Sequence, residues 1–451
     1  TLSDDITLLG VPRLLQDLRH PLRRAATLPA GKEDAIDLGA SGTLWSMVHN
    51  DPQIGGPEQL LVSASGFVPG LLFRAPICAT CPKFSNRMAI MPNGRFLATT
   101  FGPANMLVVS ITNRSWANAG FATGGDASGG YLLHREGLAM TSKAVYFVSW
   151  LGTGDVPEPG EQHDLWRSEI TYTGYERVHK LSLPPLPDGS APTWISGGEG
   201  LVSDPVADRV LFTAGRPAAA EGVLDLPREA LYIAVDGKVR RLTNSLARLA
   251  PGPDLIAQSS VANLVAFVEL DPVAGPTIRV EALSSSASAR SWPIRGAFGA
   301  KAIVEALAVT HGGKVVAVIR DSDAIHARRT VHVRDAVATA SSWRAVPLKG
   351  SAARVWLLPQ GHVLLFDRQN GRNWGPDAVL FDTKTMTLRM SYTVDLLANK
   401  GAPVTCGPSG ALLAFPIDSG LVVLGLHATE PVWISAKPPV GRFRSWRMRE
   451  L

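Results

Sequence analysis

Arginine side chains and one tryptophan are the residues of this chain best suited to recognise an anionic partner. They are Arg216, Arg228, Arg328, Arg329, Arg368, Arg372 and Trp374. A guanidinium group can hold a carboxylate or phosphate through two parallel hydrogen bonds. Arginine and tryptophan also supply much of the anchoring energy of protein interfaces. These residues predict a surface for an acidic protein partner or an anionic small molecule, and the alternative is a set of unrelated, solvated arginines.

An acidic segment raises the possibility of cation binding. The stretch DVPEPGEQHD contains Asp155, Glu158, Glu161 and His163 within nine residues. A hard cation such as Ca²⁺ needs several oxygen ligands that converge on one point. The same composition, with two prolines, is typical of a solvated loop. We favour the solvated loop and predict no bound metal.

The cysteines do not indicate a disulfide framework or a cofactor. The chain has three, of which Cys78 and Cys81 are separated by two residues. This pair is compatible with inert thiols, a local disulfide or half of a zinc site, and a zinc site would need two more ligands. The sequence also lacks the GxSxG and HExxH catalytic motifs. We therefore expect no cofactor and lean towards a protein that is not an enzyme.

Short apolar runs recur along the chain and predict its fold. Their starts lie 49, 65, 55, 51, 47 and 50 residues apart. This is the period of four-stranded β-propeller blades with loops of variable length. A fourth strand often carries a tryptophan, such as Trp292 or Trp343, which we expect to pack between blades. The seven runs are RFLATTF (95–101), AVYFVSW (144–150), RVLFTAG (209–215), LVAFVEL (264–270), VVAVIRD (315–321), HVLLFDR (362–368) and LLAFPID (412–418).

One copy, residues 204–244, also carries turn residues at characteristic places. Asp204 and Pro205 precede the strand 210–213, Asp236 and Gly237 form a small turn, and a Leu-Thr pair closes the copy at 242–243. In this pattern the stretch resembles the TolB-type, WD40-like propeller repeat. The resemblance implies an all-β propeller of four-stranded antiparallel blades. It does not imply an activity, because propellers host many unrelated functions.

The spacing of the copies is less regular at the N-terminal end, which leaves the number of blades open. Seven copies run from about residue 88 to 451, whereas residues 40–87 form an irregular copy only 36 residues before the next one. We favour seven blades over eight. Residues 1–39 do not repeat and contain a basic amphipathic segment, so we expect an N-terminal arm followed by one propeller domain over residues 40–451. We also expect an N-terminal strand to pair with the last blade, because a free sheet edge invites aggregation.

Long loops are predicted to gather on one face. In a propeller, the loops between the second and third strands of a blade lie on the same face as the connections between blades. Long, structured loops on a rigid scaffold often carry binding groups. We therefore expect a non-catalytic scaffold that binds a protein through this face as a subunit of a larger assembly. The alternatives are a propeller enzyme acting on a sugar, ester or lactone, and a structural component of an envelope complex or virus tail. The long loops are 120–137, 151–164, 184–198, 216–229, 322–329 and 369–377.

The composition of the chain bears on order, nucleic-acid binding, membrane insertion and localisation. Of the 451 residues, 45% are hydrophobic and 18% charged, which suits a packed core and argues against global disorder. The net charge of +5 comes from scattered lysines and arginines, so a nucleic-acid partner is not expected. No apolar run reaches the roughly 18 residues of a transmembrane helix. No secretory signal is recognised in the sequence, and we expect a cytoplasmic protein rather than a periplasmic or secreted one.

Overall fold

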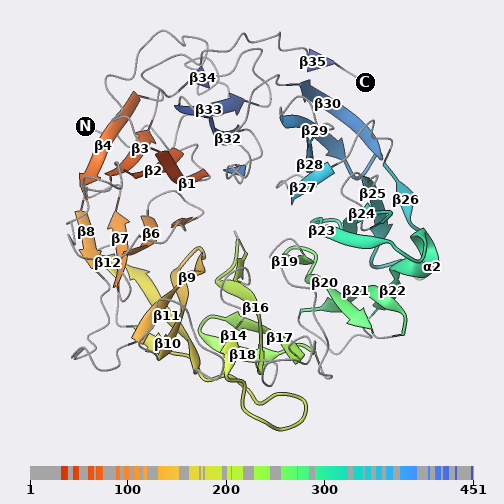
Figure 1. Ribbon diagram of the computed structural model, residues 1–451, viewed down its shortest axis with the longest axis horizontal. Coiled ribbons are helices and arrows are strands. Elements are labelled where there is room, and N and C mark those ends of the chain that lie inside the picture. The colour runs from red at the N-terminus through yellow and green to blue at the C-terminus, as the bar shows by residue number, and fades with distance from the viewer. Residues whose placement is uncertain are drawn as a thin grey trace.

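The fold is a ring of antiparallel β-sheets, seen in a computed structural model (Figure 1). The sheets follow one another round the ring in chain order, and the first strand of a sheet lies nearer the centre than the last. This is the arrangement expected for the predicted propeller. The structure describes residues 32–38, 44–49, 59–64, 68–74, 88–91, 96–101, 105–110, 115–118, 131–151, 162–171, 174–175, 178–195, 201–204, 206–216, 228–243, 255–271, 273–283, 290–322, 329–338, 341–346, 352–357, 362–368, 376–393, 405–406, 412–417, 420–425, 432–433 and 448–449.

The first four sheets, in chain order, come from residues before 242. The first sheet contains β1 (Lys32–Leu38), β2 (Leu44–His49), β3 (Gln59–Ala64) and β4 (Val68–Arg74). The second contains β5 (Met88–Ile90), β6 (Phe96–Phe101), β7 (Asn105–Ser110) and β8 (Ser115–Asn118). The third contains β9 (Tyr131–Met140), β10 (Ala144–Leu151), β11 (His163–Thr171), β12 (Gly174–Tyr175) and β13 (His179–Lys180). The fourth contains β14 (Trp194–Ile195), β15 (Val202–Ser203), β16 (Arg209–Arg216), β17 (Arg228–Val235) and β18 (Lys238–Arg241).

The remaining four sheets complete the ring. The fifth contains β19 (Ile256–Ser259), β20 (Leu264–Asp271), β21 (Gly275–Ala282) and β22 (Arg290–Pro293), and the helix α2 (Ile294–Phe298) follows it. The sixth contains β23 (Ile303–Val309), β24 (Lys314–Arg320), β25 (Arg329–Asp335) and β26 (Arg344–Ala345). The seventh contains β27 (Ala352–Leu357), β28 (His362–Arg368), β29 (Pro376–Asp382), β30 (Thr387–Thr393) and β35 (Met448–Arg449). The eighth contains β31 (Thr405–Cys406), β32 (Leu412–Ile417), β33 (Gly420–Gly425) and β34 (Val432–Trp433).

The described strands thus form eight sheets, which fits the alternative of eight copies rather than the seven that the sequence favours. The irregular copy at 40–87 supplies β2, β3 and β4, and β1 lies within the range 1–39 expected to be an arm. The boundary at residue 40 therefore falls after the first strand of the first sheet. The spacing of apolar runs missed this strand because KEDAIDL carries charges at four of its seven positions.

Among the described strands, no N-terminal strand joins the sheet of the last blade, in contrast to the closure that the sequence predicts. The first and eighth sheets are each built from consecutive strands, and β1 contacts β31 and β32 without joining their sheet. The C-terminal strand β35 pairs with β30 of the seventh sheet instead. Among the described strands, contact between neighbouring sheets therefore closes the ring, rather than a shared strand.

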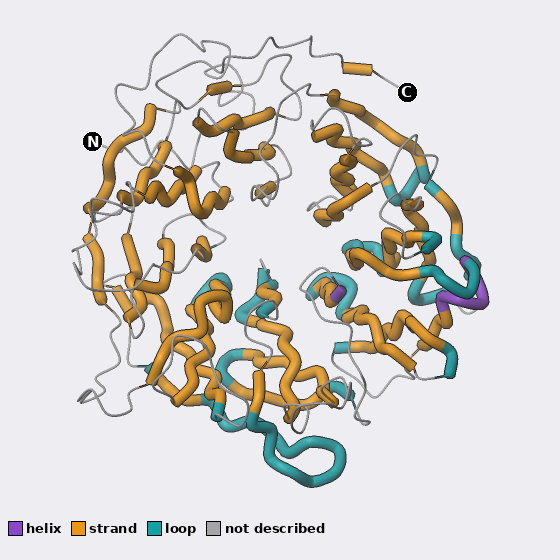
Figure 2. Tube along the Cα trace, in the orientation of Figure 1, coloured by secondary structure: helices purple, strands orange, loops and turns teal. Residues whose placement is uncertain are grey.

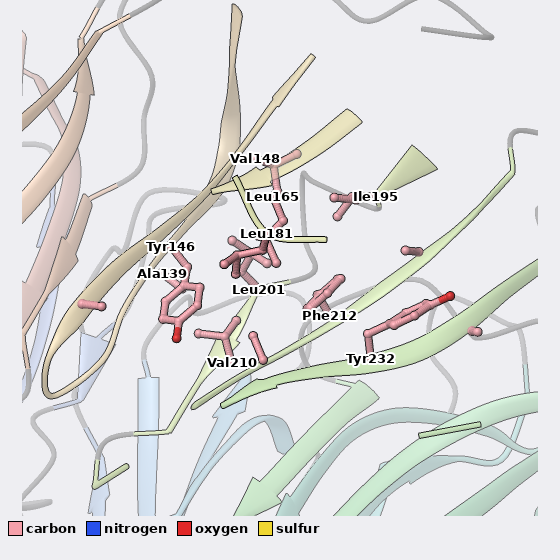
Figure 3. Packing of buried hydrophobic residues seen from close by; sticks show 14 of the residues in the cluster. Ala139, Tyr146, Val148, Leu165, Leu181, Ile195, Leu201, Val210, Phe212 and Tyr232 are labelled. Atoms are coloured by element: carbon pink, nitrogen blue, oxygen red, sulfur yellow. The ribbon is translucent and has the colours of Figure 1, made fainter. Parts of the chain in front are cut away.

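The core lies between successive sheets, because the middle strands are apolar on both faces. Along β10, Val145 and Phe147 pack towards the second sheet, whereas Tyr146 and Val148 pack towards the fourth. Figure 3 shows Tyr146 and Val148 near Phe212 of β16 across this second interface. Strands buried on both faces read as continuous apolar runs. This is why the second strands are the recurring signal in the sequence.

A buried charge network joins the third sheet to the fourth. The Asp208 carboxylate has no exposed surface and accepts hydrogen bonds from Thr141 Oγ1 at 2.6 Å and Tyr146 OH at 3.2 Å. Arg167 Nη2 lies 2.7 Å from its second oxygen, and Arg167 Nε donates to Tyr146 OH. Burial, together with the charge of Asp208, raises the pKa of Tyr146. The phenol therefore stays neutral and remains a donor to the carboxylate.

Other polar contacts link neighbouring sheets near their short turns. Asp204 accepts hydrogen bonds from the backbone and hydroxyl of Ser260 in the turn between β19 and β20, both at 3.1 Å. Arg290 donates to the carbonyl of Val337, and Lys314 Nζ donates to the carbonyl of Thr383. These contacts join the fourth sheet to the fifth, the fifth to the sixth and the sixth to the seventh.

Aromatic side chains fill the interface between the fifth and sixth sheets, as predicted for their tryptophans. The rings of Trp292 and Trp343 meet edge to face at 5.3 Å, and the Arg334 guanidinium lies 4.5 Å from the centre of the Trp292 ring. Phe298 of α2 lies 4.4 Å from the ring of His332. Burial lowers the pKa of His332 to about 4, because the charged imidazolium is disfavoured there.

The first prediction concerns Asp208. We expect Asp208→Asn to lower the free energy of unfolding by about 3 kcal/mol, because it leaves the buried Arg167 guanidinium with a neutral partner. The matched control is Asp236→Asn, which removes a carboxylate from an exposed pair with Lys143 at 3.1 Å and should cost less than about 1 kcal/mol. Urea unfolding measures both. Equal losses in the two variants would contradict a stabilising role of the buried pair.

The second prediction concerns pH. Unfolded His332 binds a proton below about pH 6.5, whereas folded His332 does so only below about pH 4. The unfolded state therefore holds more protons between these values, and lowering the pH from about 6.5 to 4 should reduce the free energy of unfolding. We expect His332→Gln to flatten this dependence. As a control, His179→Gln changes an exposed histidine and should leave the pH dependence unaltered. Unfolding curves recorded across this pH range measure the effect. An unchanged pH dependence in His332→Gln would show that the prediction is wrong.

Candidate binding face

The antiparallel sheets sort the connections of the chain onto two faces. We call long-loop face the one that carries the connections 152–162, 217–227, 321–328 and 369–375, each between the second and third long strands of a sheet. The short-turn face carries the turns 141–143, 236–237, 310–313 and 383–386. The asymmetry predicted from the sequence holds for these four sheets, whereas the corresponding connections 102–104, 272–274 and 418–419 of the second, fifth and eighth sheets have only two or three residues. Part of the predicted loop 120–137 belongs instead to β9, and Trp194 and Ile195 of the predicted loop 184–198 form β14.

Four of the predicted arginines lie at strand ends that border the long-loop face. Arg216 ends β16 and Arg228 begins β17, and the two are directly opposite in the register of the pair. Arg329 begins β25, and Arg368 ends β28 in the neighbouring sheet. Strand ends give these positions a fixed backbone, which a loop alone does not supply. Arg328, Arg372 and Trp374 lie outside the described residues.

The electrostatics of this face are described best around Arg216, whose side chain is exposed. Hydrogen bonds from the hydroxyl and amide of Ser190, together with the charge of Arg216, lower the pKa of the exposed Asp188. Asp188 is therefore ionised at neutral pH and partly offsets the charge of Arg216. The buried Glu229 follows Arg228 in β17. The basic character of this face is thus moderated by a carboxylate in the connection before the fourth sheet and by another within that sheet.

Asp188 is positioned by the connection 181–193, drawn as the long teal loop at the lower edge of Figure 2. Its residue Leu186 is buried in the core cluster between the third and fourth sheets. The hydroxyl of Tyr232 donates to the carbonyl of Pro184 at 3.1 Å, and Arg241 donates to the carbonyl of Pro185. Burial raises the pKa of Tyr232 to about 12, which keeps this donor protonated. The connection is therefore anchored to β17 and β18.

Of the four candidate cation ligands, the structure describes His163. His163, the first residue of β11, is buried and its Nδ1 lies 2.9 Å from the carbonyl oxygen of Ile195. Its ring packs at 4.3 Å on Trp194. Asp155, Glu158 and Glu161 lie outside the described residues, as do Cys78 and Cys81. The described part of the chain contains no group of three His, Cys, Asp or Glu side chains that could hold a metal.

The sequence did not reveal the polar residues that connect the sheets. Thr141, Tyr146 and Arg167 are 41 to 67 residues from Asp208 along the chain. Asp204 and Asp208 were visible only as turn residues. A buried partner far away in the sequence leaves no local pattern, so this network could not be predicted.

The comparisons with known proteins address the fold. The sequence matches no protein-family model, and no curated protein matches it. Among solved structures, the chain is similar to the WD40 domain of SCAP from fission yeast, with a TM-score of 0.50 and 9% identity over 90% of this chain and 98% of that one. The fold is a WD40-like β-propeller.

The same propeller fold also occurs in an enzyme. The dihydro-heme d1 dehydrogenase NirN is similar with a TM-score of 0.50 and 16% identity, over 91% of this chain and 76% of that one. Because these identities are low, the similarity concerns architecture, and the propeller by itself does not decide between binding and catalysis. No helix in the described part of the propeller is long and apolar enough to cross a membrane.

The third prediction concerns the acidic segment at 155–163. We expect Ca²⁺ to leave the melting temperature unchanged, because Ca²⁺ needs several converging oxygen ligands and the two prolines of this charged segment are typical of a solvated loop. A site with a dissociation constant one hundredth of the added calcium would stabilise the fold by about 2.7 kcal/mol, which a thermal melt detects. A rise in melting temperature that disappears in the double variant Glu158→Gln, Glu161→Gln would contradict this expectation.

Proposed function

We propose that this chain is a non-catalytic propeller scaffold that binds an acidic protein partner through its long-loop face, as a subunit of a larger assembly. The observation that carries the proposal is the position of Arg216, Arg228, Arg329 and Arg368. They come from three sheets, and each borders a long loop of the same face.

The chemistry of these residues supports an acidic partner. A guanidinium group is always charged and pairs with carboxylates through a fixed fork of donors. Rigid strands beneath the loops reduce the conformational entropy that binding would otherwise cost. The carboxylate of Asp188 lies in the connection that precedes the fourth sheet, and that of Glu229 lies in β17 of that sheet. We therefore place the main contact over the sixth and seventh sheets, with Arg328, Arg329, Arg368, Arg372 and Trp374.

The fourth prediction tests this surface by charge reversal. We expect the double variant Arg328→Glu, Arg329→Glu to reduce capture of the partner by at least about tenfold, since hot-spot arginines contribute about 2 kcal/mol or more. Its melting temperature should stay within a few degrees of the original, because surface substitutions change stability by only about 0.5 kcal/mol. Affinity capture from the native source, quantified by mass spectrometry, compares the proteins bound by each form.

The control places the same charge change on the short-turn face. Lys384 is exposed in the turn between β29 and β30, so Lys384→Glu should retain the captured partner. Lys314 is a poor control, because its Nζ donates to the carbonyl of Thr383 in the neighbouring sheet. Loss of the partner in Lys384→Glu but not in the double variant would assign the working surface to the opposite face.

A further inference from the structure

A row of cations lies on the side of the fourth sheet that faces the fifth. Arg209 is opposite Val235 in the register of β16 and β17, and Val235 is opposite Lys238 of β18. Arg240 is opposite Ile233, one row further along. Paired residues of a sheet point to the same side, and Val235 and Ile233 pack in the cluster shared with the fifth sheet. Arg209, Lys238 and Arg240 therefore point towards that sheet.

The described side chains of the fifth sheet supply too few negative charges to neutralise this row. Glu281 of β21 is opposite Val265, which packs in the same cluster, so its side chain faces the fourth sheet. Arg279 and Glu269 share that side but pair with each other. Among the fifth-sheet residues whose side chains the structure describes, Glu281 is thus the one carboxylate left to face the three cations.

Arg209 is the unusual member of the row. Its Nε and Nη1 atoms are buried, and no group among the described residues accepts a hydrogen bond from them. Buried N–H groups are nearly always paired in native proteins, and charged ones are the most costly to leave unpaired. Arg209 also affects its neighbour Arg240. Burial is the main cause that lowers the pKa of Arg240, and the positive charge of Arg209 lowers it further.

We propose that Arg209 and Arg240 form a binding site for a small free oxyanion, phosphate or sulfate, at the short-turn edge between the fourth and fifth sheets. The fork of a guanidinium matches two oxygens of a tetrahedral anion, and a charged acceptor makes the strongest such bonds. The buried atoms of Arg209 favour a compact ion, whereas the exposed Arg240 and Lys238 leave it a way in. This site is on the face opposite the proposed partner surface and does not depend on it.

The fifth prediction follows for inorganic phosphate. We expect phosphate to raise the melting temperature of the full chain more than chloride does at equal ionic strength, as any ligand of the folded state does. The apparent affinity for phosphate, taken from the dependence of the melting temperature on phosphate concentration, should fall at least about tenfold in Arg209→Gln and in Arg240→Gln. Each variant loses one charge-assisted pair of hydrogen bonds. Arg344→Gln is the matched control, since Arg344 is an exposed arginine of β26 outside this row.

A further variant separates binding from simple stabilisation. Glu281→Gln removes the carboxylate that faces the arginines, so it should strengthen phosphate binding several-fold even if it alters the melting temperature without phosphate. The general stabilising effect of phosphate on proteins acts on every variant alike, so only the difference between variants reports the site.

Three results would overturn the proposal. The first is an equal phosphate increment in Arg209→Gln and the Arg344→Gln control. The second is unchanged or weaker phosphate binding in Glu281→Gln, which would make Glu281 the partner of the arginines. The third is binding of O-phosphoserine in the absence of any binding of inorganic phosphate, which would assign the site to an esterified group rather than a free ion.

Discussion

The middle strands of these sheets are apolar on both faces. Both faces are buried only when a sheet lies between two others. In β16, Val210 and Phe212 belong to the cluster shared with the third sheet, whereas Leu211 belongs to the one shared with the fifth. A single sheet would leave one of these faces in water. The stability of one sheet therefore depends on the presence of its neighbours, and closure of the ring supplies the last missing neighbour through β1, β31 and β32.

Polar residues at the sheet interfaces set the alignment that apolar packing leaves loose. Asp208 and Arg209 are consecutive and face opposite sheets. Asp208 receives three side-chain donors from the third sheet, whereas Arg209 keeps two buried N–H atoms without an acceptor among the described residues. A fully paired buried charge specifies how two sheets meet. The guanidinium of Arg209, which lacks such pairing in the described part of the chain, is the group that we assign to oxyanion binding.

The strands of the fold were predictable to the extent that they are buried on both sides. The apolar runs that begin at 209, 264 and 315 match β16, β20 and β24 within one residue at their starts. β1 was missed because its charges interrupt the apolar run. β35 was missed because a strand of two residues is too short to show an alternation of apolar and polar side chains. The sequence interpretation put Arg216, Arg228 and Arg329 in long loops, whereas they are the last or first residues of strands, because the apolar pattern fades before a strand ends. The network around Asp208 was not predictable, since it depends on residues more than 40 positions away.

The carboxylate of Asp204 has a consequence for how the propeller opens. It accepts from the amides of Val206 and Ala207 in its own turn, at 2.8 and 3.1 Å, and from the amide of Ser260 in the turn of the next sheet. These three amides belong to two sheets but share one acceptor residue. Opening of either turn removes donors from this buried carboxylate and so weakens its hold on the other turn, and we expect the exchange of these amide hydrogens with solvent to be coupled. We expect the two turns to open as one cooperative unit, so that fraying at the short-turn face would involve the fourth and fifth sheets together.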